Sequence, residues 1–143
     1  MHVILNANML TFNCNIRVRY GETDQMGYVY YGNYAQYYEV ARVEMLRSLG
    51  TSYKDMEDNG VMMPVLDLYC KYIKPGRYDE NLTIKVSIRE KPGVRIKFHY
   101  EIINENEELI NIGETTLVFV NIEKNKPCHP PEDFSRRLEK YFT

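Results

Sequence analysis

The strongest constraint on the fold is a two-residue alternation of apolar and polar side chains that recurs along the chain. In the segments 82–89 and 94–102, every second residue is a large apolar one. A strand with this pattern buries one face and exposes the other, which is typical of antiparallel sheets. Lys91, Pro92 and Gly93 lie between the two segments and favour a turn, so the pair is predicted to form a β-hairpin.

Three further segments read as strands. Residues 15–20 alternate Ile16, Val18 and Tyr20 with arginines, and residues 108–121 are rich in β-branched side chains. Residues 61–75 form another apolar segment, but Pro64 has no N–H group to donate to a neighbouring strand. That strand is therefore predicted to bend at Pro64 or to begin after it.

One long helix is predicted from Tyr34 to Leu49, because its apolar residues recur at helical spacing. The apolar stripe consists of Tyr34, Tyr37, Tyr38, Ala41, Met45 and Leu49. Gln36, Glu39 and Arg47 point away from it. Asn33 precedes the helix as a candidate N-cap, and Gly50 follows it where a left-handed residue is expected.

The C-terminal segment 130–142 begins with two prolines and acidic residues. Phe134, Leu138 and Phe142 then follow four residues apart, which predicts a short amphipathic terminal helix.

The predicted order is one strand, the long helix and four more strands, an α+β arrangement in which about five antiparallel strands curl around one helix. The whole chain, 1–143, has the length of one domain, and no repeat or linker divides it. The exposed edge of such a sheet needs a partner, and pairing with a second copy would supply one.

Composition gives no support to several functional classes. The formal net charge of −2 gives no reason to expect a nucleic-acid partner, and no apolar stretch is long enough for membrane insertion. The N-terminal segment 1–10 lacks the features of a signal peptide, and Met9 is an alternative start. The cysteines (Cys14, Cys70, Cys128) and histidines (His2, His99, His129) show no metal-ligand spacing, so we expect no metal site, an exposed His99, reduced thiols and a cytoplasmic location.

A single carboxylate, Asp24, lies in a turn that contains Gly21 and Gly27 and precedes the start of the helix. The first N–H groups of a helix lack internal partners and lie at the positive end of its dipole. A carboxylate beside such donors suits acyl transfer, in which the donors stabilise a carbonyl oxyanion. The structural alternative is that Asp24 caps its own turn and the tyrosines fill the core.

Two stretches of the chain resemble a known family. The run "RVRYGETDQMGYVYYGNYAQYYEVARVEMLR" resembles the hotdog-fold acyl-CoA thioesterases of the 4-hydroxybenzoyl-CoA thioesterase-like superfamily, above all in T-D-x-x-G-x-V-Y followed by Y-E-x-A-R. "KYIKPGRYDENLTIKVSI" is similar to the middle strands of that family. The resemblance extends from about Asn13 to Ile122. It implies a curved antiparallel sheet around one helix, assembled as homodimers or homotetramers.

Carried onto this sequence, the resemblance implies that Asp24 is the catalytic carboxylate, acting as nucleophile or general base. Tyr31 matches the position whose backbone N–H polarises the thioester carbonyl. Many acyl-CoA members have His there, and Tyr is closer to the branch that acts on aromatic substrates. Gly27, Gly32 and Asn33 are expected to shape the turn that brings Asp24 to the helix.

The resemblance also implies binding residues and no cofactor. Tyr28, Tyr30 and Tyr34 are expected to line the acyl pocket. A basic rim for the phosphates of coenzyme A is expected from two groups of residues, Lys71, Lys74 and Arg77 on one segment, and Arg89, Lys91, Arg95 and Lys97 around the hairpin. Glu39 is expected to form a surface ion pair with Arg42 or a neighbouring strand, or to support the site from outside.

Two alternatives to hydrolysis of acyl-CoA or aryl-CoA stay open. One is the same chemistry on an acyl carrier protein, which a large basic patch would favour. The other is a non-catalytic acyl-CoA-binding protein that kept the fold. A hotdog dehydratase is less favoured, because no His lies near Asp24 in the sequence.

Overall fold

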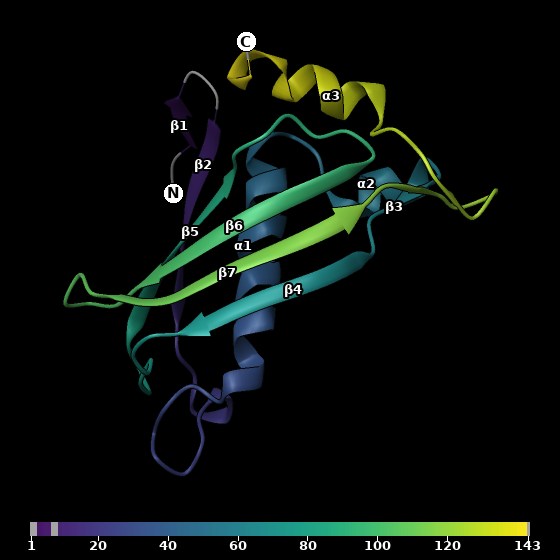
Figure 1. The fold of residues 1–143 in the computed structure, drawn as a ribbon. Coiled ribbons are helices and arrows are strands. Elements are labelled where there is room, and N and C mark those ends of the chain that lie inside the picture. Colours follow the sequence, from purple (N-terminus) through teal and green to yellow (C-terminus); the bar gives the residue numbers. More distant parts are fainter. Residues whose placement is uncertain (1–2, 7–8, 143) are drawn as a thin grey trace.

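A computed structural model of the protein describes residues 3–6 and 9–142, which leaves His2 outside the described residues. Its main sheet has six antiparallel strands in the order β1-β2-β5-β6-β7-β4, and they cross the long helix α1 at an angle (Figure 1). The strands of this sheet are β1 (Val3–Asn6), β2 (Met9–Arg17), β4 (Val65–Tyr72), β5 (Asn81–Ile88), β6 (Arg95–Ile103) and β7 (Leu109–Val118). Five of them are the five predicted strands, and β1 extends the sheet beyond β2.

Shorter strands, helices and 3-10 turns complete the fold. A small second sheet contains β3 (Val61–Met62), β8 (Val120–Asn121) and β9 (Lys126–Pro127). The helices are α1 (Tyr34–Ser48), α2 (Tyr53–Asp58) and α3 (Glu132–Leu138), with 3-10 turns η1 (Tyr20–Glu22), η2 (Tyr31–Asn33) and η3 (Glu139–Tyr141). None of the described helices is long and apolar enough to cross a membrane.

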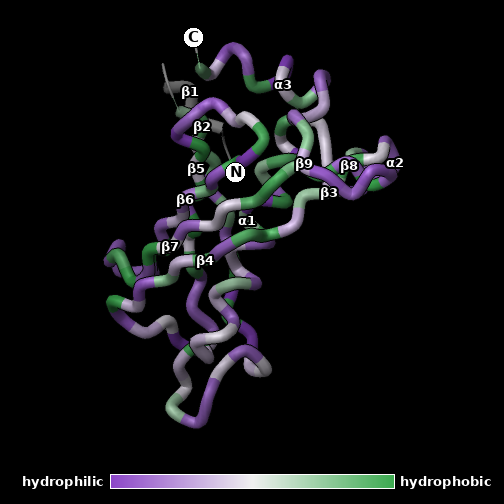
Figure 2. The backbone as a smooth tube through the Cα atoms, turned by 45° about the vertical axis from the view of Figure 1, so that its right-hand side comes forward, coloured by the Kyte–Doolittle hydropathy of each residue, from purple (hydrophilic) through white to green (hydrophobic). Residues whose placement is uncertain are grey.

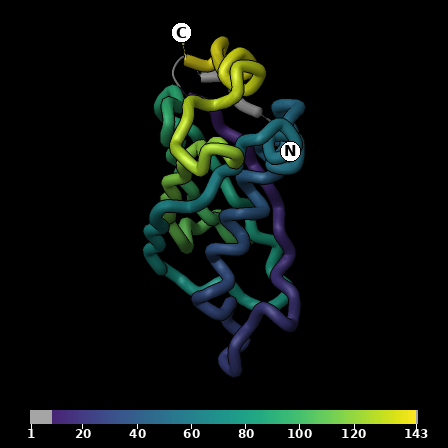
Figure 3. The backbone as a smooth tube through the Cα atoms, turned by 90° about the vertical axis from the view of Figure 1, so that its right-hand side faces the viewer, coloured from purple at the N-terminus to yellow at the C-terminus, as the bar shows by residue number. Residues whose placement is uncertain are grey.

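The alternation in the two hairpin strands is confirmed. The apolar residues of β5 and β6 that were predicted to share a face are buried against α1: Leu82, Ile84, Val86, Ile88, Ile96, Phe98, Tyr100 and Ile102. Hydrophobic and hydrophilic residues accordingly alternate along these strands (Figure 2). Turned by 90°, the molecule shows the sheet curving around α1 (Figure 3).

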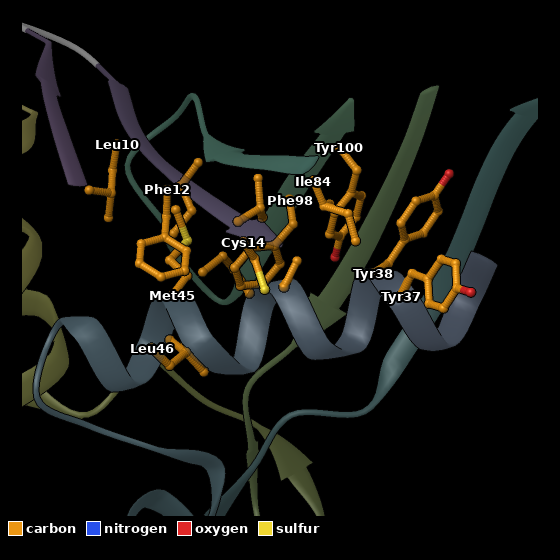
Figure 4. Packing of buried hydrophobic residues seen from close by; sticks show 14 of the residues in the cluster. Leu10, Phe12, Cys14, Tyr37, Tyr38, Met45, Leu46, Ile84, Phe98 and Tyr100 are labelled. Atoms are coloured by element: carbon orange, nitrogen blue, oxygen red, sulfur yellow. The ribbon is translucent and has the colours of Figure 1, made fainter. Parts of the chain in front are cut away.

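The apolar stripe of α1 is also confirmed, and all six of its predicted residues are buried. Tyr38 and Met45 lie between the helix and the strand residues Leu10, Phe12, Cys14, Ile84, Phe98 and Tyr100 (Figure 4). Tyr37 and Leu46 belong to the same buried cluster. Gly50 has a φ of +86°, as expected for the residue that ends a helix.

Arg42 departs from the expected ion pair with Glu39. Its side chain is buried instead, where Nε donates to the Tyr53 hydroxyl at 2.8 Å and Nη1 to the Tyr100 hydroxyl at 3.5 Å. Glu39 is exposed and has no ion-pair partner among the described residues. A charged group on the core side of a helix has to be hydrogen-bonded, and these two phenols meet that need.

The first strand was predicted at the wrong position. The observed strand β2 runs from Met9 to Arg17, so it starts earlier than the predicted residue 15 and ends before Tyr20. Tyr20 was expected on the buried face, but it begins η1 and is 79% exposed. The alternation stops at Val18 because the chain there turns into the loop that leads to α1.

Other predicted boundaries hold in part. Pro64 separates β3 from β4, as expected for a residue that cannot donate to a ladder. The terminal helix forms as α3 with Phe134 and Leu138 buried, but it ends at Leu138, and Phe142 follows the 3-10 turn η3 instead of lying on the helix. Helix α2 was missed, although Ser52 accepts a hydrogen bond from the N–H of Asp55 as an N-cap.

Candidate active site

The chain between β2 and α1 forms a compact loop, residues 18–33, beyond one end of the sheet (Figure 1). The Asp24 N–H donates to the Tyr28 carbonyl at 2.8 Å, and the Gly27 N–H donates to the Asp24 carbonyl at 3.0 Å. Gly27 has a φ of +77°, a conformation that costs a residue with a Cβ atom, so the expectation that it shapes this turn fits the geometry. The result is a tight turn with Asp24 at its start.

The segment 74–78 between β4 and β5 supports this loop. The N–H of Val29 donates to the Gly76 carbonyl at 2.8 Å, and the N–H of Tyr78 donates to the Gly27 carbonyl at 3.0 Å. Gly76 is buried, and a Cβ atom there would lie 3.0 Å from the Val29 side chain. Loop and segment therefore form one packed unit.

The two oxygens of the Asp24 carboxylate differ in their hydrogen bonds. Oδ1 accepts hydrogen bonds from the N–H of Met26 at 2.9 Å and the N–H of Tyr28 at 3.2 Å, as the structural alternative of a self-capping turn requires. Oδ2 has no hydrogen-bond partner among the described residues. The turn thus fixes the orientation of the carboxylate and leaves one oxygen available for chemistry.

Asp24 lines a pocket of about 390 Å³ at the start of α1. Five of the residues predicted for the site line it, namely Asp24, Tyr28, Tyr31, Tyr34 and Lys74. Five others also line it and were not predicted, namely Met26, Val29, Tyr72, Ile73 and Pro75. The wall is mostly aromatic and aliphatic, which suits an apolar acyl group better than a polar ligand.

The helix begins with the 3-10 turn η2, which leads directly into α1. The backbone N–H groups of Tyr31 and Gly32 donate no hydrogen bond within the part of the chain that the structure describes. They lie at the positive end of the helix dipole, next to the pocket that Tyr31 lines. This arrangement can stabilise a negative oxygen.

Asn33 directly precedes α1, as predicted, but it does not cap the helix with its side chain. Its backbone is already helical, with φ −81° and ψ −14°, and its side chain makes no capping bond. Its Nδ2 instead donates to the Glu22 carbonyl at 2.8 Å, which ties the loop to the helix start. The helical backbone that Asn33 shares with the preceding 3-10 turn differs from the extended conformation of a usual N-cap residue.

The remaining predicted tyrosines and glycines take different positions. Tyr30 is half-exposed and packs against Tyr31 with the two rings tilted by 40° and 4.6 Å between their centroids, but it does not line the pocket. Gly32 lies under that ring, because a Cβ atom there would be 2.9 Å from Tyr30 Cε2. Tyr34 is buried, and its hydroxyl accepts the Gly76 N–H at 3.3 Å.

Tyr72 is the principal pocket residue that the sequence did not reveal. It ends β4, forty-one residues after Tyr31, and its hydroxyl donates to the Tyr31 carbonyl at 3.3 Å. Desolvation and the neighbouring Cys70 thiol raise the pKa of Tyr72 to about 12, so the phenol stays protonated as a donor. Only pairing of the strand end with the helix start could have indicated this contact.

The expected basic rim is only partly present in one copy of the chain. Lys74 lines the pocket but pairs with Glu108, whose pKa it lowers. The Arg77 guanidinium lies 4.9 Å above the centre of the Tyr28 ring, beside the pocket. Lys71 is exposed on β4 and does not line the pocket.

The basic residues of the hairpin turn lie elsewhere. Figure 1 shows the β5–β6 turn at the opposite end of the sheet from the pocket loop, so the structure does not bring Arg89, Lys91, Arg95 or Lys97 to this pocket. Among the described residues, no group of three His, Cys, Asp or Glu side chains is placed to hold a metal ion.

Comparison with known proteins gives consistent matches. A family model described as the thioesterase-like superfamily matches residues 18–138. The acyl-CoA thioester hydrolase YbgC of Escherichia coli is 34% identical over 125 residues, covering 87% of this chain and 93% of the relative. A DHNA-CoA thioesterase structure from Staphylococcus aureus has a TM-score of 0.85 at 37% identity, covering 91% of this chain and 89% of that one. Slr0204, a 1,4-dihydroxy-2-naphthoyl-CoA thioesterase from Synechocystis, has a TM-score of 0.83 at 22% identity, with 90% and 95% covered, a likeness of fold alone.

Proposed function

The chain belongs to the thioesterase-like superfamily, and from this premise we propose how its pocket hydrolyses a thioester. The resemblance to hotdog-fold acyl-CoA thioesterases is confirmed, and the chain is a thioester hydrolase. Its substrate class is an acyl-CoA or aryl-CoA, which it converts to the free acid and CoA. One observation carries the proposal: Asp24 and Tyr31, at the dipole-positive helix start, line the same pocket.

We assign the reaction to Oδ2 of Asp24, the oxygen that accepts no hydrogen bond from the described residues. As a nucleophile, Oδ2 attacks the thioester carbonyl carbon, the C–S bond breaks, and the thiolate takes a proton from water. A second water then hydrolyses the mixed anhydride. As a general base, Asp24 takes a proton from the attacking water, and that proton passes to the departing thiolate. The two hydrogen bonds to Oδ1 hold the carboxylate in place for either route.

The Tyr31 N–H is assigned to the carbonyl oxygen of the substrate. Negative charge develops on that oxygen in the transition state, and an N–H that is already oriented stabilises it without reorganisation. One such donor typically contributes about 3 kcal/mol to lowering the barrier. Because the donor is a backbone group, its role does not depend on the Tyr side chain.

The binding assignments follow the pocket wall. Tyr28 and Tyr34, which line it, are proposed to contact the acyl group, with the unpredicted Tyr72 opposite them. Lys71, Lys74 and Arg77 are proposed to meet the CoA phosphates. Support comes from Lys74, which lines the pocket, and from Arg77, which lies over the ring of the pocket residue Tyr28. Lys74 must then leave Glu108 or act together with it.

We propose that the working form is a homodimer or homotetramer built on β4. This strand ends the six-stranded order and has no partner on its outer side among the described strands. Its exposed apolar side chains are Val65, Leu66, Leu68, Tyr69 and Tyr72. An open, apolar strand edge needs covering, and a second β4 would continue the sheet. A cytoplasmic location belongs to the same proposal and agrees with three free cysteines.

The test is release of free thiol by the purified protein from a panel of acyl-CoA, aryl-CoA and acyl-carrier-protein thioesters. Asp24→Asn keeps the Oδ1 acceptor for both N–H groups, so we expect the turn to survive and kcat to fall at least about 100-fold with substrate binding retained. Asp79→Asn is the matched control, since Asp79 is an exposed loop acid with a φ of +65° that Asn tolerates.

The outcomes separate the alternatives. Turnover of carrier-protein substrates alone would favour the carrier-protein reading, and binding without turnover across the panel would favour the non-catalytic one. An Asp24→Asn variant that keeps full activity would remove Asp24 from the mechanism.

A further inference from the structure

Glu22 is the most connected residue of the pocket loop, although it does not line the pocket. Its side chain is 14% exposed, and its Oε1 accepts hydrogen bonds from the Arg19 N–H at 2.8 Å and from the Tyr37 hydroxyl at 3.0 Å. Its carbonyl accepts the Tyr30 N–H at 2.9 Å and Asn33 Nδ2 at 2.8 Å. One residue therefore joins the start of the loop, the segment before η2, and helix α1.

The hydrogen bonds of Glu22 lie close to both groups of the proposed reaction, the Asp24 carboxylate and the Tyr31 N–H. Along the chain, Glu22 comes two residues before Asp24. Across the loop, its carbonyl holds the N–H of Tyr30, the residue directly before Tyr31. A displacement of Glu22 therefore changes the distance between the Asp24 carboxylate and the Tyr31 N–H.

Tyr37 connects this arrangement to the rigid part of the molecule. Its ring is buried in the stripe of α1, and its hydroxyl points away from the aliphatic core side chains (Figure 4). Among the described residues, Glu22 is the hydrogen-bond partner of that hydroxyl. Burial and the neighbouring carboxylate raise the pKa of Tyr37, so the phenol is a permanent donor.

The contribution of Arg19 is of a different kind. Its guanidinium lies 3.3 Å from Glu22 Oε2, but its side chain is 80% exposed. An ion pair that faces water contributes little to holding a loop. The position of Glu22 is therefore fixed mainly by the Tyr37 hydroxyl, the Arg19 N–H and its own carbonyl.

We propose that Glu22 is a positioning residue, anchored by the Tyr37 hydroxyl, that sets the geometry between the Asp24 carboxylate and the Tyr31 N–H. The inference rests on the proposed function for its catalytic consequence. It needs an oxygen acceptor at position 22 and not a negative charge, because the Tyr37 hydroxyl and the Arg19 N–H are both donors.

The test compares three variants in steady-state kinetics. Tyr37→Phe keeps the buried ring and removes the anchor, and Glu22→Ala removes the acceptor; we expect each to lower kcat about 10- to 100-fold with KM within about twofold, as for a small misplacement of reacting groups. Glu22→Gln keeps an oxygen acceptor and should retain kcat within about threefold. The double variant Glu22→Ala/Tyr37→Phe should be no slower than the worse single one.

The matched control is Tyr53→Phe. It also removes a phenol that hydrogen-bonds a charged side chain, here Arg42, but at α2, away from the pocket. We expect Tyr53→Phe to lower the melting temperature and leave kcat unchanged. A purely structural role for Glu22 predicts the same behaviour for Tyr37→Phe, and that result would overturn the inference.

Amide hydrogen exchange provides a measurement that does not depend on turnover. In Glu22→Ala and Tyr37→Phe, the N–H groups of Tyr28 and Tyr30 should exchange faster than in the wild type, while those of β5 and β6 stay protected. Unchanged exchange in both variants would contradict the anchor. If the wild type hydrolyses no thioester, the proposed function fails; if the wild type is active and Tyr37→Phe keeps its kcat, only this inference fails.

Discussion

The ring of Tyr38 lies directly against Gly113, so that a Cβ atom on Gly113 would stand 2.2 Å from the Cζ of that ring. The absence of a side chain at Gly113 of β7 thus makes room for an aromatic ring between α1 and the sheet. The ring stacks on Tyr100 with 4.2 Å between centroids, and its hydroxyl hydrogen-bonds Asn111 and Cys70. Burial raises the pKa of Tyr38, so this hydroxyl stays protonated.

Gly113→Ala should therefore destabilise the protein. The added methyl group meets the hydroxyl end of a buried ring, and the hydrogen bonds of that hydroxyl keep the ring from rotating away. Overpacking of this kind typically costs about 1–3 kcal/mol. Urea unfolding followed by circular dichroism measures the change. Gly93→Ala is the control, because nothing lies within 4 Å of a Cβ there. Equal unfolding midpoints for both variants would show that the Tyr38 ring yields without cost.

A charge on the outer strand should break the proposed assembly. Leu68 lies on β4 and is 45% exposed, and a lysine at that position on an open edge disfavours strand-to-strand pairing. We expect the wild type to elute as a dimer or tetramer in size-exclusion chromatography with light scattering, and Leu68→Lys to elute as a monomer. Ile122→Lys changes an equally exposed apolar residue outside the main sheet and should not alter the mass. A monomeric wild type would exclude the assembly.

The sequence predicted those parts of the fold where one local pattern decides burial. The alternation in β5 and β6 and the helical spacing in α1 each require one buried face, so their buried residues were identified correctly. Tyr20 was misassigned because the alternation continued in the sequence after the chain had left the sheet. Helix α2 is six residues long, too short for periodicity to reveal, and only its Ser52 cap indicated it.

Apart from Lys74, the pocket residues that the sequence predicted correctly are neighbours in the chain. Asp24 and Tyr31 belong to one motif, and the turn between them is short. Tyr72 and Glu108 reach the same region through strand pairing, which depends on register and not on a local pattern. For the same reason the sequence could not indicate that Lys74 pairs with Glu108.

His99 should make stability depend on pH. It was expected to be exposed, but its side chain is 16% exposed on β6, with Nδ1 3.4 Å from Glu114 Oε1. Burial, with Arg89 and Lys97 nearby, lowers its pKa against the opposing effect of Glu114 and Glu90. The unfolded chain therefore binds the proton more readily, and the stability that neutral His99 contributes is present above about pH 6.5 and lost as the pH falls.

The measurement is the urea midpoint at pH 7.5 and at pH 5.5 for the wild type and for His99→Gln. We expect the wild type to lose more stability between these two values than the variant, because the variant lacks the group that takes up the proton. The carboxylates titrate in both proteins, so the difference between the two losses isolates His99. An identical pH dependence would show that the environment of His99 does not alter its titration.

Tyr31→Pro tests the assigned oxyanion donor directly, since proline has no N–H group. Tyr31 is the first residue of η2, where a helix accepts proline, and Tyr30 has a ψ of 132°, the extended conformation that a residue before proline prefers. We therefore expect a folded protein whose kcat falls about 100- to 1,000-fold. Tyr31→Ala keeps the N–H and loses the same ring contacts with Tyr72 and Tyr30, so it should retain most of kcat while KM rises. If the alanine variant loses kcat as severely as the proline variant, the side chain and not the backbone carries the role.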